Sequence, residues 1–192
     1  HVDHAVIEQV FRLLEAGRQL FAQRFFDDAR TGEADLGVVV DGGETEGLWC
    51  QPYRSDRLAA VLTQDDVLDG PSVKFSDLIE RDLVGLEGGS TLTRLLTAQA
   101  ELQMHTMALR VQVRSFEAVC RAVQARLGIG ILPLAAARSF ADAMQLKVLP
   151  LADNWALRRM QICMRSRPAQ QTPLGLLATH LEAIAAGDDA LP

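Results

Sequence analysis

The chain has 192 residues, of which 48% are hydrophobic and 23% are charged, and its formal net charge is −6. These proportions are ordinary for a globular protein and exclude a disordered or fibrous chain, and the length fits one domain or two small ones. The acidic balance argues against nucleic-acid binding by this chain itself, because phosphate neutralisation needs a concentrated face of Lys and Arg. No apolar run approaches the ~18 to 20 residues needed to span a bilayer, so we expect no membrane partner.

The first part of the chain is predicted to form one long helix and then strands. Residues 1–30 have a nearly continuous helical pattern. The segment "EADLGVVV" predicts a helix end, a turn and a buried strand, and "GLWCQPY" predicts a short strand after the glycine-rich turn "DGGETEG".

From residue 57 to residue 151, predicted strands alternate with predicted helices over short connections. The predicted strands are residues 57–63, 83–87, 108–114, 129–133 and 146–151, and the predicted helices are residues 76–82, 92–102, 116–127 and 135–144. Gly128 is expected to end the third of these helices. Repeated β-α-β units with short connections imply parallel strands joined by right-handed crossovers. The middle of the chain is therefore predicted to be a doubly wound α/β layer.

The last part of the chain has a different pattern. The segment "RRMQICMR" alternates apolar and polar residues as a strand does, and a final helix is predicted from Thr172, with Pro173 at its first position, to Gly187. The two ends of the chain together suggest a second layer beside the central one. We therefore expect two lobes between which the chain crosses twice.

Two corners between a predicted strand and a predicted helix have the form of an anion site. The segment "LEGGST" places Gly89, Ser90 and Thr91 at a helix start, and "VRSFEA" places Ser115 and Phe116 at another. Backbone N–H groups, hydroxyls and the positive end of a helix converge at such corners, and open α/β sheets bind ligands beyond the carboxyl ends of their strands. A serine that only caps its helix is the commoner interpretation of each corner, so both interpretations stay open.

Signatures of catalysis and of metal binding are not found in the sequence. It contains no G-x-S-x-G elbow, no phosphate loop and no H-E-x-x-H motif, so we assign no catalytic residue, no metal ligand and no cofactor. The three cysteines are Cys50, Cys120 and Cys163. An odd number without metal-like spacing disfavours a disulfide framework or a zinc site and favours a reducing cytoplasm. Cys120 is predicted to be in the core, and Cys163 is expected to be more exposed.

The order of these segments resembles the C-terminal effector-binding domain of LysR-type transcriptional regulators. The resemblance runs from about residue 30 to residue 187, and "SFEAVCRAVQARLGIGILP" is its most specific part. The other segments that carry it are "GEADLGVVV", "LWCQPYRSDRLAAVLT", "VKFSDLIERDLVGLEGGSTLTRLL", "LKVLPLADNW" and "RMQICMR".

The resemblance implies a two-lobed α/β fold of the type 2 periplasmic-binding-protein class, with parallel-rich sheets and flanking helices. Lobe one would comprise residues 1–58 and 151–192, and lobe two residues 59–150. The family's opening strand and loop should precede "GEADLG", but residues 1–30 have a helical pattern instead. We therefore expect an incomplete lobe one.

The resemblance also implies a function. The domain would be a cytoplasmic sensor, not an enzyme, that binds a small, anionic metabolite such as a carboxylate in a cleft between the lobes and so alters a homodimer or tetramer. DNA would be bound only through an N-terminal winged helix-turn-helix domain, which this sequence does not contain. Effector contacts would come from the positions that match Gly89, Ser90 and Thr91, from Ser115 and Phe116, and from Arg57 at the crossover.

Two other classes of protein share this fold. A solute-binding protein of a transport system would need a leader peptide and usually a longer chain, and unpaired cysteines suit an oxidising periplasm badly. An enzyme would need titratable side chains that converge on the cleft, where the sequence offers chiefly hydroxyls, amides and one arginine.

Overall fold

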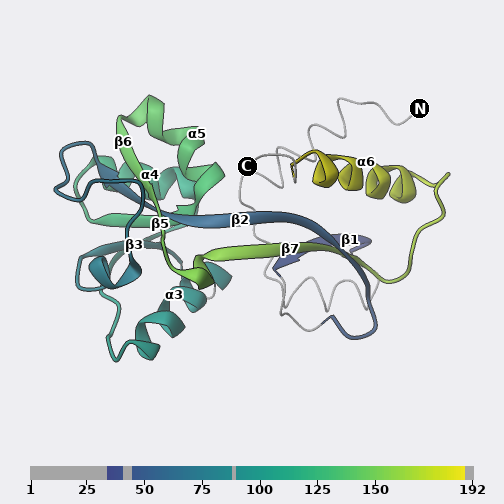
Figure 1. The fold of residues 1–192 in the computed structure, drawn as a ribbon, viewed down its shortest axis with the longest axis horizontal. Coiled ribbons are helices and arrows are strands. Elements are labelled where there is room, and N and C mark those ends of the chain that lie inside the picture. Colours follow the sequence, from purple (N-terminus) through teal and green to yellow (C-terminus); the bar gives the residue numbers. More distant parts are fainter. Residues whose placement is uncertain (1–33, 41–44, 88–89, 189–192) are drawn as a thin grey trace. The chain divides into compact units, whose positions relative to one another are not determined.

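The computed structural model describes residues 34–40, 45–87 and 90–188, and within these ranges the chain divides into two compact units. Unit 1 contains the described residues up to residue 55 and from residue 158 onward, and unit 2 contains Asp56–Leu157 (Figure 1). The helix predicted over residues 1–30 lies outside the described residues, as does Gly89.

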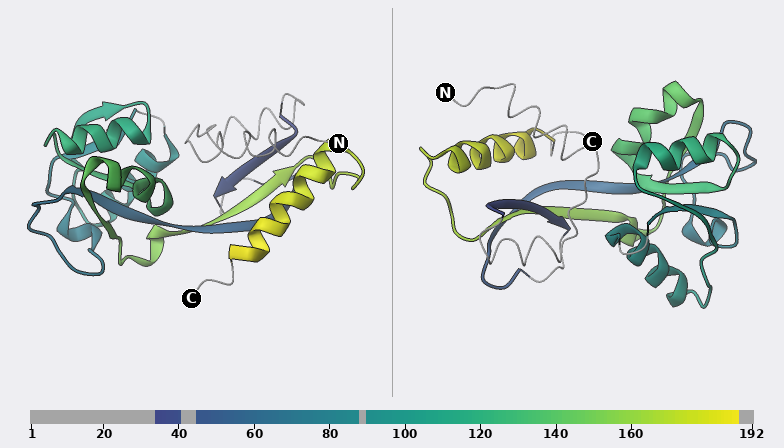
Figure 2. Two further views of the ribbon diagram at one scale, coloured as in Figure 1. Left: turned by 90° about the horizontal axis from the view of Figure 1, so that it is seen from above. Right: turned by 180° about the vertical axis from the view of Figure 1, so that it is seen from behind.

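The described part of unit 1 contains three neighbouring strands and the C-terminal helix. The strand order is β1 (Leu36–Val40), β7 (Leu157–Met164) and the first half of β2 (Trp49–Thr63), with β1 antiparallel to β7. Because side chains alternate along a strand, Ile162 and Met164 pack against Ala178 and Leu181 of α6 (Pro173–Asp188), whereas Cys163 packs with Val39. The helix α6, drawn in yellow in Figure 2, lies alongside β7.

The strand β2 is longer than the sequence pattern predicts. The segments "GLWCQPY" and "RLAAVLT" were expected to form two strands, but they form one continuous strand of 15 residues. The polar residues 54–57 interrupt the apolar pattern between them. The backbone stays extended because β2 has β7 as its neighbour on one side and pairs with β5 and β6 further along.

Unit 2 is built on a five-stranded part of the sheet. Its strands after β2 are β3 (Leu83–Leu86), β4 (Leu109–Val113), β5 (Ile129–Pro133) and β6 (Leu146–Pro150). β3 is parallel to β4 and β5, and both β5 and β6 are antiparallel to β2. The predicted parallel arrangement therefore holds for β3 to β6, and β2 runs in the opposite direction.

The connection between β2 and β3 explains this difference. It was predicted to contain a helix over residues 76–82, but it contains only a single 3-10 turn, η1 (Phe75–Asp77). The connection starts at Thr63 and returns to Asp82 at the same edge of the sheet, where both residues line one hollow. A chain that returns to the edge it left starts its next strand in the opposite direction, whereas a parallel strand needs a crossover.

The helices of unit 2 cover both faces of its sheet. α4 (Phe116–Gln124) and α5 (Leu134–Met144) lie on one face, and α3 (Thr91–Leu102) lies on the other (Figure 1). α4 follows the predicted apolar stripe, with Val119, Cys120 and Val123 fully buried, but it ends at Gln124. A second 3-10 turn, η2 (Asn154–Ala156), follows β6.

The cysteines correct two predictions. Cys50 and Cys163 form a disulfide, with their Cα atoms 4.2 Å apart, and Cys163 is fully buried instead of exposed. The prediction from the odd number of cysteines was wrong, because the number of cysteines does not indicate whether two of them lie on neighbouring strands. Cys120 is in the core as predicted, and burial raises the pKa of its thiol to about 11.

Candidate functional site

The carboxyl ends of β3 and β4 lie side by side at one edge of the unit 2 sheet. Leu86 pairs with Val113 in parallel register, and the backbone N–H of Glu87 donates to the carbonyl oxygen of Val113 at 2.9 Å. α3 begins just after β3, and α4 begins just after β4. The N-terminal, partially positive ends of α3 and α4 therefore lie at the same edge of the sheet.

Ser90 caps α3 and is almost fully buried, with 6% of its surface exposed. Its Oγ accepts a hydrogen bond from the Thr93 backbone N–H at 3.0 Å and donates to Thr93 Oγ1 at 2.8 Å, which in turn donates to the Leu86 carbonyl at 3.1 Å. The single hydroxyl proton of Ser90 is thus used inside the fold. Thr91, the first residue of α3, is partly exposed.

Ser115 caps α4, and its side chain is exposed. Its Oγ accepts a hydrogen bond from the Ala118 backbone N–H at 3.1 Å, and this bond leaves the hydroxyl proton able to donate to a ligand. The side chain of Phe116 instead packs in the core of unit 2, with 7% of its surface exposed. At this corner Phe116 offers its backbone N–H, which has no partner within the helix.

An ion pair at the same edge was missed by sequence reasoning. Arg114 Nε donates to Glu87 Oε1 at 2.8 Å, and the hydrogen bond and charge of Glu87 raise the pKa of Arg114. Both side chains are exposed, so this pair is open to solvent and to ligands. Each residue immediately flanks one of the two predicted corners, and that position in "LEGGST" and "VRSFEA" was a signal that could have identified them.

Arg57 lies on β2 at the same edge of the sheet, because the next residue, Leu58, pairs with Pro133 at the carboxyl end of β5. Its Nη1 donates to the carbonyl oxygens of Leu151 at 2.8 Å and Asp153 at 3.4 Å. These bonds tie β2 to the segment that follows β6. Of the residues expected at the site, the structure thus places Ser90, Thr91, Ser115, Phe116 and Arg57 at one edge, whereas Gly89 lies outside the described residues.

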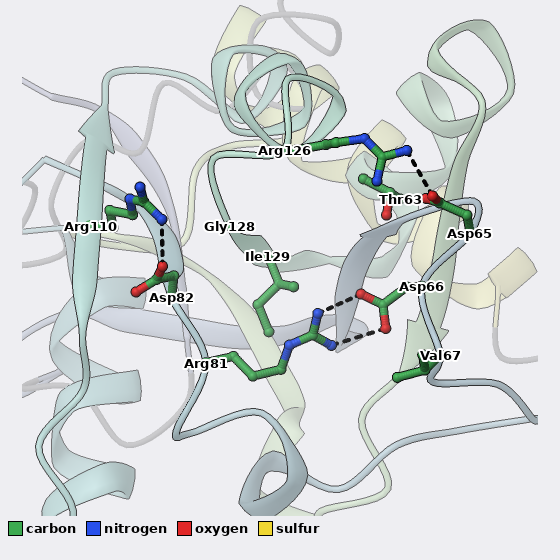
Figure 3. A pocket seen from close by; sticks show the side chains of 10 residues that line it. All are labelled: Thr63, Asp65, Asp66, Val67, Arg81, Asp82, Arg110, Arg126, Gly128 and Ile129. Carbon is green, nitrogen blue, oxygen red and sulfur yellow. Dashed lines mark hydrogen bonds and ion pairs between the residues drawn. The ribbon is translucent and has the colours of Figure 1, made fainter.

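A hollow of about 470 Å³ lies at the opposite edge, where the parallel strands begin. Figure 3 shows that three arginines of this hollow each face an aspartate. The pairs are Arg81 with Asp66, Arg110 with Asp82 and Arg126 with Asp65, at 2.5, 2.6 and 2.7 Å. Because the charges balance, an anion would have to displace a carboxylate to reach any of these arginines. The edge that carries Ser90 and Ser115 is therefore the better candidate for an anion site.

The described residues offer no clear site for a metal ion. Within ranges 34–40, 45–87 and 90–188, no group of three or more His, Cys, Asp or Glu side chains could hold one. In the same ranges, no helix is both long enough and apolar enough to cross a membrane.

Comparison with known proteins identifies related sequences. The family model of the LysR substrate binding domain matches residues 18–185. A probable RuBisCO transcriptional regulator of Synechocystis sp. is 25% identical over 138 residues, which are 67% of this chain and 39% of that protein. The corresponding regulator of Gracilaria tenuistipitata var. liui is 26% identical over 140 residues, 67% of this chain and 44% of that protein. The chain thus spans about two fifths of the length of these relatives.

Solved structures share the fold. The CcmR regulatory domain of Synechocystis PCC6803 in complex with 2-PG has a TM-score of 0.72 and 20% identity, and the match covers 84% of this chain and 78% of that chain. A full-length BenM mutant has a TM-score of 0.75 and 17% identity, covering 96% of this chain and 63% of that chain. The reduced OxyR regulatory domain from Pseudomonas aeruginosa has a TM-score of 0.68 and 20% identity, and the match covers 85% of this chain and 77% of that chain. The two-lobed, binding-protein-like fold expected from the sequence is thereby confirmed.

Proposed function

This chain belongs to the family of LysR substrate-binding domains, and from that premise we propose that it senses a small anionic metabolite at the carboxyl edge of β3 and β4. The observation that carries the proposal is the pair of capped helix N-termini, at Ser90 and Ser115, that follow these two neighbouring parallel strands. Helix N-termini attract anions through their unpaired backbone N–H groups and the helix dipole. The complex of the CcmR regulatory domain with 2-PG supports the sensing of a small metabolite by this fold.

The residues take different roles in this proposal. Thr91 and Ser115 contact the effector, because Thr91 is partly exposed and Ser115 is exposed. Ser90 and Arg57 stabilise the conformation of this edge through the hydrogen bonds that they make inside unit 2. Phe116 supplies its backbone N–H group. Arg114 offers a guanidinium to a carboxylate or phosphate once Glu87 releases it.

The wider role follows from the relatives. They are transcriptional regulators, so we propose that this domain acts in the cytoplasm, in a homodimer or tetramer, and that DNA is bound by another part of a longer protein. The effector would shift the equilibrium between states of this assembly by binding one state more tightly. Regulation is preferred to solute transport because the curated relatives are regulators, and we propose binding without turnover, so an effector should be recovered unchanged after incubation with the protein.

Isothermal titration calorimetry of the chain with a panel of carboxylic and phosphorylated acids tests the proposal. We expect at least one acid to bind, and Ser115→Gly to weaken that binding about tenfold or more, since a hydrogen bond to a charged group contributes about 1.5–3 kcal/mol. Glycine is tolerated at a helix N-cap with a loss of only a few tenths of a kcal/mol, so the helix should persist. Ser139→Ala, in α5, is the control and should leave affinity unchanged.

A second variant tests whether the effector is negatively charged. Glu87→Gln removes a negative charge from the edge and releases Arg114, so we expect it to bind the same acid more tightly than the parent chain. Failure of every acid to bind, or equal affinities in Ser115→Gly, Glu87→Gln and the parent chain, would contradict the assignment of the effector to this edge.

A further inference from the structure

The disulfide between Cys50 and Cys163 joins two neighbouring strands of unit 1. Cys50 is the second residue of β2, and Cys163 is the next-to-last residue of β7. The cysteines are 113 positions apart in sequence, and the loop that the bond closes contains all of Asp56–Leu157. The bond therefore ties together the two segments by which the chain leaves unit 1 and returns to it.

The closeness of the two cysteines does not depend on the bond between them. β7 and β2 are hydrogen-bonded neighbours in the sheet, and the Cα separation of 4.2 Å is near that of directly opposite residues on paired strands. Both cysteines also pack in one small apolar cluster with Val39, Leu48 and Ala34. After reduction, sheet pairing and packing would keep the two sulfurs within reach of each other.

Exposure decides which sulfur can be attacked. Cys50 is partly exposed and Cys163 is fully buried, so Cys50 is the more accessible of the two cysteines to a small thiol from solvent. The remaining cysteine, Cys120, is buried in the core of unit 2, and its raised pKa keeps it as an unreactive thiol. Thiol–disulfide exchange is therefore directed to one pair of residues.

We propose that Cys50 and Cys163 form a reversible oxidation site, which exchanges with low-molecular-weight thiols and disulfides and makes the order of unit 1 depend on redox state. In reduction, a thiolate attacks Sγ of Cys50, Cys163 leaves as a thiolate, and a second thiolate releases Cys50 and forms the small disulfide. In oxidation, the Cys50 thiolate attacks a small disulfide and expels one thiolate. The Cys163 sulfur, after losing its proton, then attacks Cys50 and expels the second. Overall, two cysteine thiols and one small disulfide give the protein disulfide and two small thiols.

The redox state of Cys50 and Cys163 changes what holds two strands of unit 1 together. In the oxidised form, a covalent bond holds the start of β2 to the end of β7. In the reduced form, sheet hydrogen bonds, the small cluster around Val39 and the cluster of Ile162 and Met164, against which Trp49 and Tyr53 pack, still hold these segments together, but without a covalent bond. Reduction should therefore loosen unit 1 locally, and the core of unit 2 should be unaffected, because the bond lies outside it. The two cysteines belong to unit 1 and the edge at Ser90 and Ser115 belongs to unit 2, and the test of the redox proposal requires no effector.

The first experiment equilibrates the folded chain in glutathione buffers of increasing oxidised fraction, then traps thiols by alkylation and locates them by mass spectrometry. We expect Cys50 and Cys163 to pass together from alkylated to protected, with the same midpoint from both directions, while Cys120 stays unlabelled until the chain is unfolded. Two outcomes overturn the proposal: a disulfide that persists in excess reduced glutathione, and a dithiol that persists in excess oxidised glutathione.

The second experiment measures backbone hydrogen exchange in both redox states. We expect exchange in peptides that cover residues 49–53 and 160–164 to rise on reduction, with peptides from β3 and β5 unchanged. Cys120→Ala should behave as the parent chain does, and Cys50→Ser should match the reduced chain in either buffer. Equal exchange in both states of the parent chain, which needs no variant to fold, would show that the bond does not order unit 1 and would overturn that part of the proposal.

Discussion

At the scale of single residues, burial separates two adjacent aspartates that have the same chemistry. Asp65 and Asp66 both pair with arginines at the hollow of unit 2, but the side chain of Asp66 is 7% exposed and that of Asp65 is 60% exposed. Arg81 binds Asp66 through both carboxylate oxygens, and the Leu68 backbone N–H adds a third bond. Exposed ion pairs contribute little to the free energy of unfolding because water and salt screen them. A buried charged group that loses its partner, by contrast, lowers the stability of the fold considerably.

Asp66→Asn should therefore destabilise the chain by about 1–3 kcal/mol, because an amide cannot satisfy the Arg81 guanidinium as a carboxylate does. Urea denaturation followed by circular dichroism measures the difference. Asp65→Asn is the matched control, and its midpoint should stay close to that of the parent chain. Equal losses in the two variants would mean that burial does not distinguish these pairs.

The same pair should make stability depend on pH. The hydrogen bond from Arg81 is the largest cause that holds the pKa of Asp66 below its ordinary value of 3.8 in the folded chain. A carboxylate with a lowered folded pKa contributes its stability above the unfolded pKa and loses it as the pH falls through the folded value. The difference in free energy of unfolding between the parent chain and Asp66→Asn, measured by urea denaturation, should thus be constant above about pH 5 and decrease below about pH 4. If this difference increased at acid pH, the result would contradict a stabilising ion pair between Asp66 and Arg81.

At the scale of elements, the packing of α4 on β5 depends on a glycine. A Cβ atom placed on Gly130 would lie 2.7 Å from Cγ1 of Val119 and 3.4 Å from Cγ2 of Val123. Val119 is a fully buried, β-branched residue within a helix, where one side-chain rotamer is strongly preferred, so it has little room to move. The absence of a side chain at position 130 lets the helix lie close to the strand.

Gly130→Ala should therefore cost about 1–3 kcal/mol of unfolding free energy through overpacking. Gly85→Ala is a useful comparison, because its Cβ would also lie 2.7 Å from an atom, but that atom is Cδ2 at the flexible end of the partly buried Leu109. We expect Gly85→Ala to cost clearly less in the same thermal and urea unfolding experiments. The reverse order would show that the spacing of α4 and β5 is not limited by Val119.

At the scale of the whole molecule, the described apolar core is distributed unequally. Unit 2 has one large cluster, to which all five of its strands and its three α-helices contribute. The described part of unit 1 has two smaller clusters, one around Val39 and Cys163 and one around Ile162 and Met164. A single continuous core is what allows a segment of about 100 residues to fold by itself.

The segment Asp56–Leu157, expressed alone, should therefore fold cooperatively. Circular dichroism should show helix and strand together with a single sigmoidal thermal transition. Val61→Asp within the same segment is the control, since it places a charge at a fully buried position of β2 and should abolish the transition. A gradual, non-cooperative melt of the parent segment would mean that unit 2 needs unit 1 to fold.

The sequence alone determined the features that depend on local patterns. The alternation of β3, α3, β4, α4, β5, α5 and β6, the caps at Ser90 and Ser115 and the buried stripe of α4 follow from periodicity and from capping chemistry, which act within a few residues. The family resemblance supplied the fold class and pointed to the corners at which we propose the effector binds.

The tertiary structure decided what depends on partners distant in the sequence. The continuity and direction of β2 depend on strands that pair with it from later in the chain, and the Cys50–Cys163 bond depends on β2 and β7 being neighbours. The ion pair of Glu87 with Arg114 likewise joins two corners that are 27 residues apart. Cysteine number and local charge carry no information about which strands lie side by side, because strand pairing is set by the packing of the whole sheet.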